Sequence, residues 1–213
     1  MRRFLATSML CLAILAPSTA FGAFVTTHET EIEAIYAGVG GGIDVRYGPT
    51  TFLNDPSYLT LSSEAKVLAL LDLPAPASPT INLFFVDTLS WCGVADPGFY
   101  GCATTPGHNV FVESVFTASA LGDELVAHEI GHNLGLGHVS DPARLMDPSI
   151  AGGTTLTASE ITTILSSPLI QNDGVDFIYI NPILVTPEPG TFALLSLGIV
   201  GLIAQRRRVR ARS

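Results

Sequence analysis

Residues 128–138 constrain this chain more than any other stretch. They read HEIGHNLGLGH, which has the spacing H-E-x-x-H-x-x-G-x-x-H. Histidines four positions apart lie on one face of an α-helix, because a turn takes 3.6 residues. His128 and His132 can therefore bind the same metal ion. The stretch predicts a helix that carries both histidines and ends close to Gly135.

The glycine and the third histidine extend this prediction. We expect Gly135 to leave the helix with a positive φ, which residues with a Cβ resist, and so to bring His138 to the same ion. Three histidine ligands leave a fourth tetrahedral position open, which is typical of a catalytic Zn²⁺ site. Glu129 adjoins the first ligand. Its carboxylate is expected to act as general base on a zinc-bound water and then as acid toward the leaving amine.

With a methionine downstream, this motif resembles the metzincin clan of zinc endopeptidases, which carry it together with a Met-turn under the metal. Met146, within residues 145–148 (LMDP), lies eight residues after His138. This short gap is similar to the matrixin branch. The resemblance implies one catalytic Zn²⁺, a protein or peptide substrate, and a pocket wall formed after the methionine. Matrixins usually have an aromatic residue where Ile150 stands, so the resemblance does not extend to pocket shape.

The resemblance also implies an α/β (α+β) fold, with a twisted mixed sheet, two or three helices and a small irregular C-terminal subdomain. Apolar spacing and a capping box at Thr157–Glu160 predict elements around the motif. These are helices over 29–37, 62–71 and 157–165, and strands over 43–47, 81–87 and 109–113. The strand over 109–113 is expected to line the substrate cleft. Residues 177–180 fit either a strand or the start of a tether.

The N-terminus predicts a secretory signal peptide over residues 1–23. Arg2 and Arg3 precede an apolar run over residues 4–16, and small residues follow up to Ala20. This order of basic, apolar and small residues is that of a cleaved export signal. An uncleaved anchor is the alternative, although the apolar run is short for a membrane span. The metallopeptidase domain is then expected over residues 24–185.

The C-terminus, residues 186–213, predicts a sorting signal. Pro187, Glu188 and Pro189 precede fourteen apolar residues over 191–204, and an arginine cluster follows. The order resembles the PEP-CTERM sorting signal of Gram-negative bacteria. That resemblance implies a short transmembrane helix, processing by an exosortase at the inner membrane, and export to the cell surface or an exopolysaccharide matrix. A plain membrane anchor is the alternative.

The charge distribution excludes one class of partner. Seven of the ten basic residues lie in the two terminal segments, whereas nineteen acidic and three basic residues lie between Arg3 and Arg206. The body of the protein therefore carries a net charge near −16. Binding to nucleic acid through phosphates requires clustered cations, so no nucleic-acid partner is expected. The acidic body suits basic substrate segments or Ca²⁺. Asp87, Asp96 and Asp123 are candidate calcium ligands.

Two cysteines remain once Cys11 is removed with the signal peptide. Cys92 and Cys102 form an even pair in an exported chain, which favours a disulfide. Closing so short a loop would stabilise the fold by about 2–3 kcal/mol. The alternative is that Cys92 acts as a cysteine switch that blocks the zinc, as in matrixin propeptides.

Two other functions remain open at this level. A non-catalytic surface or matrix protein could retain the metalloprotease fold, although the intact Glu129 argues against this. A hydrolase of non-peptide amides would use the same metal chemistry. The sequence favours an exported zinc metalloendopeptidase over both.

Overall fold

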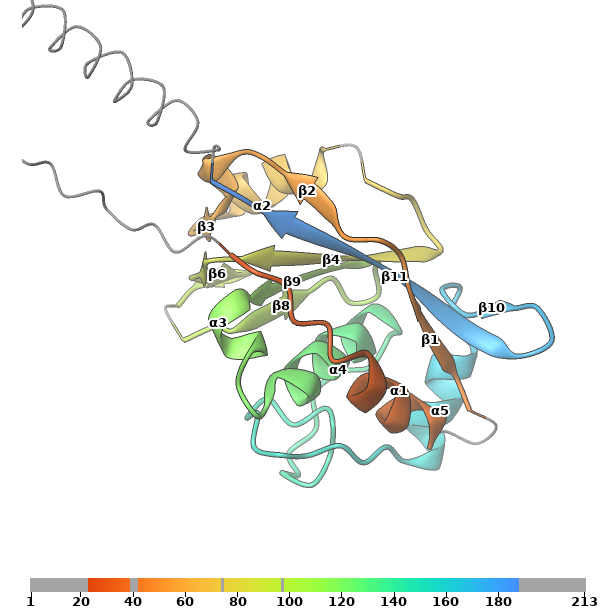
Figure 1. The fold of residues 1–213 in the computed structure, drawn as a ribbon. Helices are drawn as coiled ribbons and strands as arrows, with labels where there is room; N and C mark the ends of the chain where they lie inside the picture. The colour runs from red at the N-terminus through yellow and green to blue at the C-terminus, as the bar shows by residue number, and fades with distance from the viewer. Residues whose placement is uncertain (1–22, 39–41, 74, 97, 188–213) are drawn as a thin grey trace, which may run out of the picture.

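A mixed β-sheet forms the centre of the molecule (Figure 1). The computed structural model describes residues 23–38, 42–73, 75–96 and 98–187. The strand order is β1–β11–β4–β9–β8, with bounds Asp44–Tyr47, Asp176–Val185, Thr80–Val86, Asn109–Glu113 and Gly101–Ala103. Strands β1, β11, β4 and β9 are parallel, and β8 runs antiparallel to β9. With the helices described below, this confirms the predicted mixed α/β fold.

The long strand β11 joins the two halves of the sheet. One side pairs with β4, and the other pairs first with β1 and then with β2 (Thr51–Leu53). Pro182 lies where β1 has ended and β2 has not begun. Its carbonyl faces this side, so its missing N–H falls in the gap between the two neighbours. A proline is therefore tolerated in a central strand, and residues 177–180 are strand rather than tether.

Helices cover both faces of the sheet. Helices α1 (Glu29–Ala37), α4 (Gly122–Asn133) and α5 (Ala158–Leu165) contribute to one apolar core, and α2 (Glu64–Leu71) contributes to the other. Strand β4 shows why both cores form. Leu83 and Phe85 belong to the first core, whereas Phe84 and Val86 belong to the second. A strand buried on both faces needs the continuous apolar run that the sequence shows.

Local sequence signals account for several boundaries. Helix α1 has the predicted bounds. Helix α2 begins at Glu64 with Ser63 as its N-cap residue. The capping box of α5 is complete, because Thr157 accepts from the Glu160 N–H and the Glu160 side chain accepts from the Thr157 N–H. The shorter elements are η1 (Pro56–Tyr58), β3 (Thr60–Leu61), β5 (Thr88–Leu89), β6 (Trp91–Cys92), β7 (Val94–Ala95), α3 (Ser114–Thr117) and β10 (Gln171–Asn172).

Between α4 and α5 the chain follows an irregular path without helices or strands. We call residues 136–156 the Met-turn segment; a single bridge between Arg144 and Thr155 is its only regular backbone pairing in the described chain. Among the described residues, no helix has the length and apolar character that a membrane span requires. The predicted apolar helix over 191–204 and most of the predicted signal peptide lie outside the described residues.

Candidate metal centre

Helix α4 carries the first two histidines of the motif. Ten of its twelve residues are buried, because the sheet lies on one side of the helix and the Met-turn segment on another. Leu125, Val126 and Ile130 belong to the core shared with the sheet. His128 and His132 lie one turn apart with ring centroids at 4.8 Å, so the helix presents both imidazoles in the same direction.

The helix ends where the sequence predicts. Gly135 has φ +97°, a conformation that residues with a Cβ rarely adopt. Its N–H donates to the carbonyl of His132, and the N–H of Leu136 donates to the carbonyl of Gly131. Together these bonds resemble a glycine-terminated C-cap. The chain then turns back toward the helix and places His138 beside the first two histidines.

The three imidazoles converge on one point. His138 Nε2 lies 3.2 Å from His128 Nε2 and 3.0 Å from His132 Nε2. Tetrahedral Zn²⁺ with bonds of about 2.0–2.1 Å holds its ligand nitrogens about 3.3 Å apart. In the described chain, these histidines are the one group of three or more potential metal ligands within such reach of each other. Their spacing fits a single zinc ion.

In His128 and His132, the hydrogen bond made by Nδ1 determines that Nε2 faces the point where the three rings meet. His128 Nδ1–H donates to the carbonyl of Leu145 at 2.7 Å, and His132 Nδ1–H donates to the carbonyl of Leu136 at 2.8 Å. A carbonyl can only accept, so each Nδ1 carries the proton and each Nε2 presents a lone pair. The lone pairs of His128 and His132 thus face Nε2 of His138, which is the arrangement in which three imidazoles can bind one cation. Such backbone acceptors also orient metal-binding histidines.

Burial keeps these groups in their neutral forms. It lowers the pKa of His128 to about 4 and lowers the pKa of His132 as well. A neutral imidazole is the form that binds a metal. Burial also raises the pKa of Glu129 to about 8. A cation at the histidine centre would favour the ionised carboxylate instead.

A groove of about 470 Å³ brings Glu129 and the three histidines together. One of its sides is strand β8. A Cβ built on Gly101 would lie 2.5 Å from Glu129 Oε1, so only a glycine lets the strand pass this close to the carboxylate. The other side is formed by Pro148 and Ile150 of the Met-turn segment. An extended peptide in this groove would lie between a strand edge and an apolar wall.

The prediction that residues 109–113 line the cleft is wrong. These residues form β9, which is enclosed between β4 and β8. Strand β8 instead borders the groove through Gly101, Cys102 and Ala103. Strand β8 has only three residues, with glycine and alanine at its ends, so it shows no recognisable strand pattern in the sequence.

Met146 packs against helix α4 at Gly131, beside His132 in the sequence. It is fully buried, and a Cβ built on Gly131 would lie 2.6 Å from its Sδ atom. The N–H of Val139 donates to the carbonyl of Met146 at 2.9 Å. The preceding residue, Leu145, provides the carbonyl that orients His128. The turn around Met146 therefore supports the helix from below and one histidine directly.

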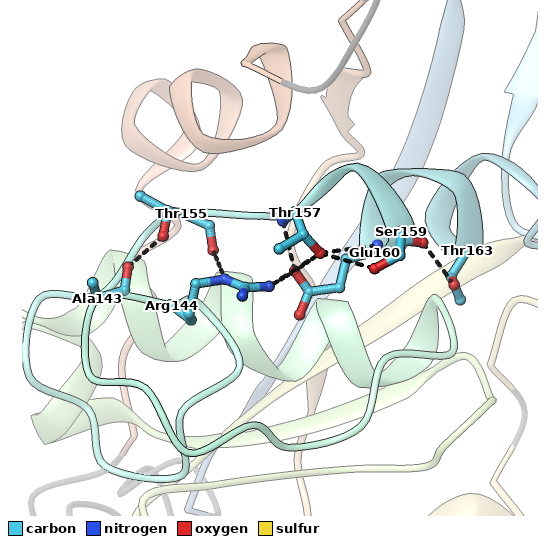
Figure 2. A network of polar contacts seen from close by, with 7 residues as sticks. All are labelled: Ala143, Arg144, Thr155, Thr157, Ser159, Glu160 and Thr163. Carbon is cyan, nitrogen blue, oxygen red and sulfur yellow. Dashed lines mark hydrogen bonds and ion pairs between the residues drawn. The ribbon is translucent and has the colours of Figure 1, made fainter.

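A polar network anchors this turn to α5. Figure 2 shows the side chain of Arg144, from the Met-turn segment, directed toward Thr157 and Glu160 at the start of the helix; Arg144 forms an ion pair with Glu160. Its guanidinium also donates to the carbonyl of Thr155 and to Thr157 Oγ1, each at 3.3 Å. Both partners of the ion pair are largely buried. Arg144 directly precedes Leu145, so the network fixes the backbone that orients His128.

The two cysteines form a disulfide beside the groove. The bond joins Cys92 in β6 to Cys102 in β8. It ties the small hairpin of β6 and β7 to the strand that borders Glu129. In this arrangement Cys92 is not available as a thiol to block the zinc.

The remaining predicted residues do not gather at the centre. Asp87, Asp96 and Asp123 form no common cluster in the described chain, and nothing in it supports a calcium site. Pro187 is the last described residue, and Glu188 and Pro189 lie outside. The place of Gly101 and the contacts of Arg144 could not be predicted from the sequence, because both depend on segments distant in the sequence.

Comparisons with known families agree with this geometry. Residues 112–165 match the family model described as matrixin, and this span runs from β9 to α5 through the histidines and Met146. Residues 185–208 match the PEP-CTERM protein-sorting motif. No curated protein matches the chain. The matrixin match and the histidine cluster indicate a zinc metalloprotease, and the sorting motif indicates export. Both resemblances drawn from the sequence are thereby confirmed: the chain carries a matrixin-type segment around its histidines and a PEP-CTERM sorting motif near its C-terminus.

Proposed function

We propose that this protein is an exported zinc metalloendopeptidase in which His128, His132 and His138 hold the ion. The convergence of their three Nε2 atoms beside Glu129, in a groove along strand β8, carries the proposal. Three protein ligands would leave the ion a position open for a water or a substrate oxygen. When bound, Zn²⁺ supplies a Lewis acid that makes a water more acidic and polarises a carbonyl.

Glu129 performs the proton transfers. Its carboxylate accepts a proton from the attacking water and delivers it to the amine nitrogen as the peptide C–N bond breaks. The passage of β8 against its Oε1 atom limits where the carboxylate can turn.

The substrate binds as an added strand. Strand β8 ends the path of the sheet, and within the described chain its outer edge has no strand partner. An extended peptide can pair with such an edge through its backbone and place alternate side chains in the groove. The side chain after the cut bond would meet the apolar wall formed by Pro148 and Ile150.

We also propose where the protein acts, from the signals at its two ends. Residues 1–23 would act as a cleaved signal peptide, residues 24–185 as the peptidase domain and residues 186–213 as the sorting signal. Pro187, Glu188 and Pro189 would be recognised by an exosortase-type enzyme at the inner membrane of a Gram-negative bacterium. The product would then reach the cell surface or the extracellular matrix. The match of residues 185–208 to the sorting motif supports this route.

The Glu129→Gln variant tests the mechanism. Glutamine keeps the shape of the side chain and cannot accept the proton. We expect it to bind zinc as the wild type does and to cleave a fluorogenic peptide library at least about 100-fold more slowly. The control is Asp123→Asn, a carboxylate on the same helix. Its rate should remain within a factor of about two of the wild type.

The outcomes separate the candidate functions. Cleavage that a chelator abolishes and added Zn²⁺ restores supports the peptidase. Zinc binding by the wild type without cleavage of any peptide would instead support a non-catalytic surface or matrix protein. Turnover by Glu129→Gln at the wild-type rate would contradict the role of the carboxylate.

A further inference from the structure

Glu124 makes a set of contacts that the mechanism does not use. It lies in the first turn of α4 and is only 2% exposed. Its carboxylate accepts three backbone hydrogen bonds from the Met-turn segment. The donors are the N–H groups of Ala151, Gly152 and Gly153, at 3.2, 2.6 and 2.8 Å. A single side chain thus holds three consecutive residues of a loop that has no helix or strand.

The position of Glu124 on the helix favours a carboxylate. The first turn of a helix presents unpaired N–H groups and the positive end of the helix dipole. Three further N–H groups from the loop surround the two oxygens, so the charge is satisfied without a basic residue. Glu124 is four residues before His128 and therefore lies one turn away on the same face.

The loop residues allow this close approach. Gly152 has φ +98°, a conformation that favours glycine. A Cβ on Gly153 would lie 2.5 Å from the carbonyl oxygen of Arg144. Nearer the start of the loop, the Asp147 carboxylate accepts from the Ser149 N–H at 2.9 Å and closes a local turn. Pro148 and Ile150, which form the wall of the groove, thus lie between this local turn and the three residues that Glu124 holds.

We propose that Glu124 is a positioning residue that sets the specificity of the groove. It joins the helix that carries His128 to the loop that carries Ile150, so the distance between the metal centre and the apolar wall is fixed. The pocket between them, with Leu125 on the helix side, accepts the side chain after the cut bond. Without the hydrogen bonds of Glu124 to residues 151–153, Pro148 and Ile150 can move, and the groove discriminates less between substrate side chains of different length. This inference rests on the proposed function.

The test compares two peptide hydroxamates that bind the zinc and differ only in the side chain entering the pocket, one as long as leucine and one longer by a phenyl group. Their affinities for the full zinc-loaded chain are measured by calorimetry in the wild type and in Glu124→Gln. We expect the ratio of the two affinities to change by at least about fivefold in the variant. Asp123→Asn, in the same turn, should leave the ratio within about twofold.

Hydrogen exchange provides the direct measure of the tether. In Glu124→Gln, the amides of residues 151–153 should exchange at least about tenfold faster than in the wild type, whereas amides in β4 should not change. If Glu124 only stabilised the fold, its substitution would lower the folded fraction. Binding of both hydroxamates would then weaken by the same factor, and the ratio of their affinities would not change.

Two results would overturn the inference. One is an unchanged affinity ratio in a Glu124→Gln variant that folds and binds zinc. The other is unchanged exchange at residues 151–153. If Glu124→Gln does not fold, Glu124→Asp gives the same two measurements with a shortened carboxylate. Hydroxamate binding needs the metal and the pocket but no turnover, so a wild-type chain that binds both inhibitors and cleaves no peptide contradicts the proposed function alone.

Discussion

The two sides of the groove are held in different ways. Strand β8 belongs to a sheet whose ladders and two apolar cores involve many residues. The Met-turn segment has no strand or helix, and side-chain anchors from Arg144, Glu124 and His128 hold its backbone. Many residues therefore stabilise the sheet side of the groove, whereas a few side chains stabilise the side formed by the Met-turn segment. Substitutions in the sheet should change global stability, whereas substitutions at the anchors should change the metal site.

Phe84→Ala should give the largest effect and test the sheet side. Phe84 is 2% exposed and stacks on Phe111 at 5.3 Å in the core that faces α2. The cavity left by the ring should lower the free energy of unfolding by about 3–5 kcal/mol. Denaturant unfolding measures this loss. Peptidase activity per folded molecule should not change, and a fall in that activity would break the comparison.

Removal of the metal tests the segment side. A ligand that binds the folded chain alone, at 100 to 1,000 times its dissociation constant, stabilises it by about 3–4 kcal/mol. Chelation should therefore lower the free energy of unfolding by about that amount. Hydrogen exchange should rise more in residues 136–156 than in β4 or β11, because two of the three ligands orient on carbonyls of this segment. Equal increases of hydrogen exchange in residues 136–156 and in the sheet would contradict the proposed difference between the two sides of the groove.

Arg144→Met tests one anchor. Methionine keeps much of the side-chain volume and removes the ion pair with Glu160, which leaves a largely buried carboxylate without its charged partner. We expect a loss of about 1–3 kcal/mol in the free energy of unfolding, together with weaker zinc binding. Zinc titration with a chromogenic chelator measures the second effect.

Arg46→Met is the matched control. Arg46 forms its ion pair with Asp173 at the surface, far from the groove in sequence and sheet position. Solvent weakens such pairs. Zinc affinity should therefore be unchanged, and an equal loss of zinc affinity in both variants would remove Arg144 from the set of anchors.

Gly131→Ala should give the smallest effect. Its Cβ would approach Met146 Sδ to 2.6 Å, and the flexible thioether can move aside at a cost of about 1 kcal/mol. Thermal unfolding of the zinc-loaded chain should show a small decrease. Gly137→Ala serves as the control, since its Cβ would meet no atom within 4 Å. A larger decrease for Gly137→Ala would show that the contact with Met146 is loose.

The parts of the site that the sequence predicted are those that depend on local geometry. The spacing of His128 and His132, the positive φ at Gly135 and the capping box at Thr157 each follow from a few neighbouring residues. The strands over 81–87 and 109–113 were also recognisable, because strands buried on both faces have continuous apolar runs.

The parts that were missed depend on tertiary contacts. Strand β8 is too short to show a pattern, and its place beside Glu129 follows from pairing with β9. The contacts of Glu124 could not be foreseen, because its three donors come from residues 27 to 29 positions later. Residues 177–180 were left open between a strand and a tether, because the strands that pair with β11 lie far away in the sequence.

The position of β11 has a consequence for biogenesis. This strand separates β1 from β4, yet it is synthesised after every other described element. Until residues 176–185 have emerged, β1 has no strand to pair with and β4 is unpaired on the side that β11 occupies. A chain threaded through a translocation channel from its N-terminus would therefore stay open until the last strand has crossed.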